Sequence, residues 1–151
     1  MTVASADLKG LGRSLSTAQD LLAKLQFDFA RIKSDPHDVY AAFDFFVTAE
    51  HLPEWCDDKD VRYTEPLLRV VSHLATGAKH FTPSPERHKS VADVGSRAGI
   101  FNPAIFNSEV FNAGGLTVVL KGAEIATLGA EIGVLDLAHR VLTFWEQRLA
   151  S

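Results

Sequence analysis

The chain has 151 residues, of which 46% are hydrophobic and 23% charged, and its formal net charge is −4. This composition is typical of a globular protein and excludes a disordered tail, a collagen-like repeat and a disulfide-stabilised scaffold. No overall excess of basic residues is present, which excludes a global positive field for holding nucleic acid by its phosphates. At this length we expect one domain over residues 1–151.

The apolar segments of the chain are short. The first 20 residues contain no run that suits a signal peptide, and nowhere are 18 consecutive residues apolar. We therefore expect no contact with a membrane. The single Cys56 cannot form an internal disulfide, which favours a cytoplasmic location. Its acidic neighbours Asp57 and Asp58 disfavour a thiolate, so a catalytic cysteine is not expected.

The first predicted helix covers residues 16–34. Thr17 followed by Asp20 is a pattern typical of a helix start. Leucine, phenylalanine and isoleucine then recur at helical spacing.

The second predicted helix covers residues 36–51. Asp35 can cap it, and Pro36 suits a first turn because its missing N–H has no helical partner there. We expect this helix to end near Leu52-Pro53, because a proline disfavours helix in the residue before it. A third helix is predicted over residues 64–81; it ends there because a proline-rich loop follows.

The second half of the chain mixes loops, strands and a helix. Residues 91–115 are rich in glycine and asparagine, which is typical of turns and loops. Strands are predicted over 116–120 and 124–128, and a last amphipathic helix over 133–149. The expected fold is mostly α (α+β): a bundle of three to four helices with a small antiparallel hairpin or sheet before the C-terminal helix.

Two helices carry polar side chains on one line each. Arg69, His73 and His80 lie opposite the apolar side of the third helix, and Asp44 and His51 share one line of the second. If the two lines meet, all five residues form one pocket, with Asp44 beside Arg69 and a histidine that holds its proton more tightly. Otherwise the lines are hydrated faces or structural hydrogen-bond networks. We take these five residues as candidate catalytic residues.

Metal and cofactor sites have little support. Asp44 and His51 are seven residues apart, and so are His73 and His80; this spacing is about 10.5 Å along a helix, which is too far for two ligands of one ion. Phosphate-binding glycine motifs and a nucleophile elbow are absent from the sequence. We expect no metal and no cofactor. Residues 61–97 contain six basic and three acidic residues, a patch compatible with phosphate contact and hence, weakly, with nucleic acid.

Two segments carry a resemblance. Residues 41–55 (AAFDFFVTAEHLPEW) and 69–81 (RVVSHLATGAKHF), with FWEQ at 144–147, resemble small helical proteins of bacteria and phages that have no assigned activity. Arg69 and His73 are also distantly similar to HEPN-type nucleases, in which four to six residues separate the arginine and histidine; here three do. The second resemblance implies a metal-independent nuclease or phosphodiesterase. In such an enzyme, Arg69 would bind the phosphate, and His73 or His80 would act as general acid or base.

Four large apolar residues occupy the Gly/Asn-rich segment: Phe101, Ile105, Phe106 and Phe111. A loop seldom exposes so many, so we expect either the chain's own core, a homodimer contact or another protein to cover them. The favoured function is a small non-catalytic interaction or regulatory protein. The alternative is the HEPN-like nuclease or phosphodiesterase, and a metal-assisted hydrolase is a weaker third.

Overall fold

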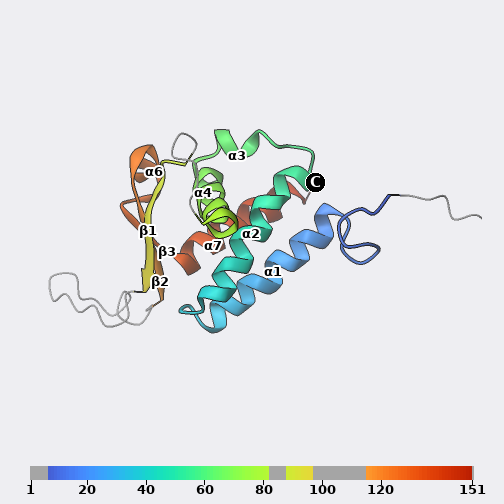
Figure 1. Ribbon diagram of the computed structural model, residues 1–151, viewed down its shortest axis with the longest axis horizontal. Coiled ribbons are helices and arrows are strands. Elements are labelled where there is room, and N and C mark those ends of the chain that lie inside the picture. The colour runs from blue at the N-terminus through green and yellow to red at the C-terminus, as the bar shows by residue number, and fades with distance from the viewer. Residues whose placement is uncertain (1–6, 82–87, 97–114, 151) are drawn as a thin grey trace, which may run out of the picture.

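The secondary structure is mainly helical, with a small sheet before the C-terminal helix, as the sequence predicts (Figure 1). The computed structural model describes residues 7–81, 88–96 and 115–150. In chain order the elements are α1 (Ala18–Ser34), α2 (Val39–Trp55), α3 (Val61–Thr64), α4 (Pro66–His80), β1 (Val91–Ser96), β2 (Leu116–Leu120), η2 (Gly122–Glu124), α6 (Ile125–Leu128), β3 (Glu131–Gly133) and α7 (Val134–Arg148).

Side chains cap the first two helices. The Thr17 hydroxyl accepts a hydrogen bond from the Asp20 N–H, and the Asp20 carboxylate accepts one from the Thr17 N–H, each at 3.0 Å. This reciprocal capping box confirms the predicted start of α1. The predicted start of α2 at Asp35-Pro36 is wrong: Asp38 caps that helix by accepting two backbone N–H groups of its first turn. Asp35 instead ends α1.

The end of α2 also differs from the prediction. The helix continues through Pro53 to Trp55. Leu52 and Pro53 are both buried, so tertiary packing outweighs the local preference against helix before proline. Helical hydrogen bonding continues after the proline, because the Cys56 N–H donates to the Leu52 carbonyl, four residues earlier, at 2.9 Å.

The strands correct two further predictions. Residues 91–96, expected as loop, form β1, which pairs antiparallel with β2. The strand predicted over 124–128 is wrong, because these residues form the end of η2 and the short helix α6. The second partner of β2 is β3, so the sheet has the order β1-β2-β3. Alternation in β2 confirms the predicted strand there, with its first, third and fifth residues buried.

The helices surround one hydrophobic core. α2 packs between α1 and α4, and α7 packs behind all three (Figure 1). The sheet lies at one end, against α4 and α7. Phe45, Val118 and Trp145 are fully buried and belong to one continuous cluster, so a helix, a strand and the last helix share this core. Within the described part of the chain, no helix combines the length and apolar character that crossing a membrane requires.

Candidate functional site

A polar network joins α1 to α2 around a fully buried carboxylate, that of Asp28. It accepts hydrogen bonds from the side chains of Lys24, Arg31 and Thr48. The Arg31 Nη1 atom also donates to Asp44 Oδ2 at 2.6 Å, and this bond raises the pKa of Arg31. Asp44 is therefore held by α1, within the pair of helices that it helps to join.

A second network joins α2 to α3 and α4. Glu50 Oε1 accepts hydrogen bonds from Ser72 Oγ at 3.2 Å and pairs with Arg62 Nη1 at 3.1 Å. Burial raises the pKa of Glu50. His51 lies beside this network, where burial lowers its pKa and the positive charge of Lys79 lowers it further. Both effects favour the uncharged form of His51.

His73 holds the start of β1 against α4. Its Nδ1 atom accepts backbone hydrogen bonds from the N–H groups of Ser90 at 3.2 Å and Val91 at 3.1 Å. Burial, followed by the nearby His88, lowers the pKa of His73 to about 4. Because two N–H donors point at Nδ1, the proton of the neutral ring is on Nε2. The arrangement is that of a structural acceptor.

Arg69 anchors the connection after β2. Its Nε atom donates to Glu124 Oε1 at 2.7 Å, and its Nη1 atom donates to the Tyr63 carbonyl at 2.9 Å. Glu124 is buried, so this ion pair holds η2 against α4. The expected pairing of Arg69 with Asp44 is therefore wrong. His80 is exposed at the last residue of α4.

The five candidate residues do not converge on one pocket. Asp44 belongs to the α1–α2 network, His51 lies beside the α2–α4 network, and Arg69 and His73 contact the segments that flank the sheet. The two polar lines therefore face different neighbours instead of each other. Asp44 contacts α1, whereas Arg69 and His73 hold η2 and the start of β1 against α4.

Several polar residues of these networks were missed from the sequence: Asp28, Glu50, Ser90 and Glu124. A signal for Asp28 was present, because it lies at helical spacing among the apolar residues Leu21, Leu25 and Ile32. A carboxylate on the buried side of a helix requires donors from a neighbour. Nothing in the sequence indicates that Glu124 reaches Arg69, because the two are 55 residues apart.

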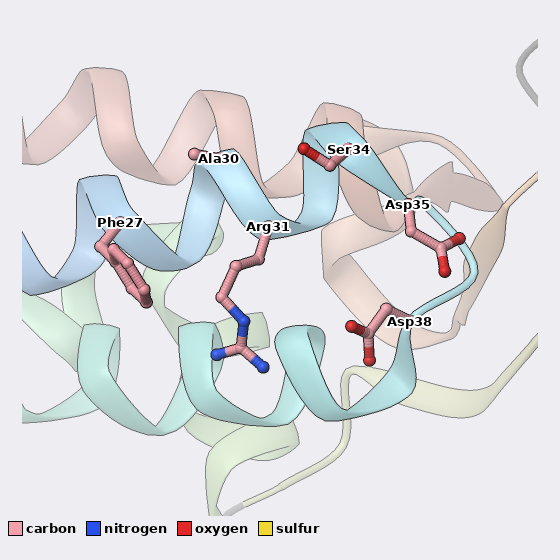
Figure 2. Close-up of a pocket in the computed structure, with 6 residues that line it drawn as sticks. All are labelled: Phe27, Ala30, Arg31, Ser34, Asp35 and Asp38. Atoms are coloured by element: carbon pink, nitrogen blue, oxygen red, sulfur yellow. The ribbon is translucent and has the colours of Figure 1, made fainter.

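Two hollows lie on different faces. One, of about 340 Å³, runs along α1 to the start of α2 and is lined by Phe27, Ala30, Arg31, Ser34, Asp35 and Asp38 (Figure 2). The other, of about 280 Å³, lies between α4 and β1, beside His73 and Gly77. Across residues 7–81, 88–96 and 115–150, no three histidine, cysteine or carboxylate side chains are grouped so that they could hold a metal ion. Burial raises the pKa of the Cys56 thiol, as expected for an unreactive cysteine.

Large aromatic side chains are exposed on α1 and α2. Phe27 of α1 is 63% exposed, and Tyr40 and Phe43 of α2 are 78% and 49% exposed. Phe27 lies one turn before Arg31, and Tyr40 lies one turn before Asp44, so the two rings flank the Arg31–Asp44 ion pair. We call Phe27, Tyr40 and Phe43 the aromatic face. The apolar loop residues singled out in the sequence, 101–111, lie outside the described residues.

Comparison of the chain with protein-family models, curated proteins and solved structures finds no significant match.

The lowered pKa of His73 predicts that the folded protein becomes less stable in acid. Its pKa is about 4 in the folded protein against 6.5 for the free side chain. Between these values the unfolded chain binds the proton and the folded protein does not, so stability falls as pH is lowered from 6.5 towards 4. Allowing for solvent screening at this half-buried ring, we expect a loss of about 1–2 kcal/mol.

Urea unfolding at several pH values measures this effect. His73→Asn retains a side-chain oxygen able to accept the backbone N–H groups but cannot titrate, so it should flatten the pH dependence. His80→Asn makes the same chemical change at an exposed position and should leave the wild-type dependence in place. Equal slopes in wild type and His73→Asn would show that His73 does not hold the strand in this way.

Proposed function

We propose that this protein acts without catalysis, as an interaction protein that forms a homodimer through the aromatic face. The observation that carries this proposal is the exposure of three large aromatic side chains on two adjacent helices. Isolated apolar residues are common on protein surfaces, whereas a group of them marks an interaction site. Aromatic residues are also enriched at the centres of protein interfaces.

Hydrogen bonds between α1 and α2 hold the two helices that carry the aromatic face. The Arg31–Asp44 ion pair between its rings is tied to the buried Asp28, so both helices are held in register beneath it. A surface that is already ordered loses little conformational entropy when a partner binds. A second copy of the same apolar surface is a suitable partner, because an isologous contact needs a patch that complements itself.

The polar residues give less support to the nuclease or phosphodiesterase alternative. A general base needs an available nitrogen, and His73 Nδ1 already accepts two backbone hydrogen bonds. A phosphate-binding arginine needs free donors, whereas Arg69 donates to Glu124 and to the Tyr63 carbonyl. His51 and Asp44 belong to other contacts. The four side chains make contacts within the fold, whereas a nuclease or phosphodiesterase would need them to contact the substrate.

Analytical ultracentrifugation at micromolar concentrations tests the proposal. We expect the wild type to sediment as a dimer, and Tyr40→Ser or Phe43→Ser to weaken self-association by about tenfold or more, because each removes an aromatic ring from the contact. Ile125→Ser is the matched control, since Ile125 is 39% exposed on α6, away from the aromatic face. It should leave the dimer unchanged.

Two results would contradict the proposal. One is a wild-type protein that stays monomeric over this range of concentrations. The other is hydrolysis of RNA or a phosphodiester that is lost in Arg69→Ala and in His73→Asn while both variants remain folded.

A further inference from the structure

Two side chains of α4, one turn apart, hold the sheet against this helix. Arg69 pairs with Glu124, which follows β2, and His73 accepts hydrogen bonds from the N–H groups at the start of β1. β1 lies at an edge of the sheet, with β2 as its neighbour. A hollow of about 280 Å³ lies between β1 and the α4 residues Leu74 and Gly77. His73 therefore holds β1 to α4 at the first residue of the strand, beside this hollow.

The ring of His73 can hold the strand only while its Nδ1 atom carries no proton. The N–H groups of Ser90 and Val91 both donate to this atom, at 3.2 and 3.1 Å. A charged imidazole carries a proton on each nitrogen and accepts no hydrogen bond. A proton on Nδ1 would therefore face two backbone donors, and both hydrogen bonds would be lost. Charging of the ring and attachment of β1 exclude each other.

The groups around His73 favour its uncharged form while β1 is attached. Burial disfavours the charged ring, and positive charge on His88, whose ring centroid is 5.3 Å away, or on Lys121 repels it. Glu124 attracts a proton to the ring, but its carboxylate already pairs with the guanidinium of α4. Asp93 of β1 lines the hollow, and its carboxylate accepts the N–H of the next residue. Separation of β1 from α4 would let water reach the charged ring.

We propose that His73 is a pH-sensitive switch: when its ring takes up a proton, the first residues of β1 separate from α4 and the hollow between them widens, while the helices stay folded. Pairing of the strands does not depend on this ring. The Lys121 N–H donates to the Ser90 carbonyl at 2.9 Å, and β1 pairs with β2 along its length. Release is therefore a local opening, which costs less free energy than global unfolding. It involves a different face from the proposed dimer contact on α1 and α2.

Amide hydrogen exchange measured by NMR tests the switch at single residues. The pKa of His73 is about 4 while β1 is attached, and we expect the ordinary value of 6.5 once it is released. Lowering the pH from 7 to 5 should therefore raise the opening equilibrium at the Ser90 and Val91 N–H groups by about tenfold or more, after correction for the intrinsic exchange rate. The Lys121 N–H reports on the pairing of the strands and should keep its protection.

Two variants separate the switch from a general effect of acid. His73→Asn keeps an acceptor for both N–H groups but cannot titrate, so exchange at Ser90 and Val91 should lose its pH dependence. His80→Asn makes the same change at the exposed last residue of α4 and should respond to pH as the wild type does. Far-UV circular dichroism at each pH verifies that the helices are folded. If His73→Asn does not fold, the comparison of Ser90 with Lys121 in the wild type still decides the question.

Three results would overturn the switch. The first is an opening equilibrium at Ser90 and Val91 that stays the same between pH 7 and pH 5. The second is an equal loss of protection at Lys121, which would mean that acid opens the whole sheet. The third is a folded His73→Asn variant that keeps the wild-type pH dependence, which would assign the response to another group, such as His88. None of these results bears on the proposed dimer, which is tested separately.

Discussion

Asp28→Ala is expected to lower the free energy of unfolding by about 2–4 kcal/mol, because it removes the acceptor at the centre of the α1–α2 network. Asp28 is fully buried, and three side chains donate to it. Without the carboxylate, the Thr48 hydroxyl loses a buried partner, and two cations lose their counter-charge. Lys24 and Arg31 are partly exposed and can recover some hydration, which places the effect below that of a fully buried pair.

Urea unfolding followed by circular dichroism measures this loss. The matched control is Asp44→Ala, which removes a carboxylate bonded to the same Arg31 but 42% exposed. Surface ion pairs contribute little, so we expect this variant to cost about 1 kcal/mol or less. If the two variants were equally stable, burial of Asp28 would not be the source of its effect.

Phe45→Ala is expected to have the largest effect, a loss of about 3–5 kcal/mol, because it leaves a large cavity in the core. Phe45 is fully buried on α2 and meets Phe46 edge to face, with ring centroids 5.4 Å apart. α2 is packed by α1, α4 and α7, so the surrounding helices cannot collapse readily into the space. A loss of this size is a substantial part of the stability of an average domain.

Phe43→Ala provides the comparison, since it makes the same chemical change two residues away, at a half-exposed position. It should cost about 0.5 kcal/mol or less in unfolding of the monomer, while weakening the dimer. Phe45→Ala should destabilise the fold itself. Similar unfolding losses in the two variants, measured at dilutions where both are monomeric, would contradict the division of α2 into a buried and an exposed aromatic side.

The polar residues of the candidate site show how far sequence reasoning reaches. Helical spacing correctly placed Arg69 and His73 on one side of α4, since periodicity is a local property of the chain. It could not identify what that side faces. The partners of Arg69 and His73 are Glu124 and the backbone of residues 90–91, and these approach α4 only because the sheet packs at its end.

The sequence by itself determined the helices α1, α4 and α7, the strand β2 and the mainly helical class, because caps, prolines and apolar spacing act within a few residues of one another. Tertiary structure decided the remainder. Because Leu52 and Pro53 are buried, α2 continues past Pro53. Residues 91–96 form a strand because they pair with β2, and residues 125–128 form a short helix where a strand was predicted. Tertiary structure also paired Asp44 with Arg31 instead of Arg69. The partner in an ion pair depends on which helices pack together, and no local sequence pattern encodes that packing.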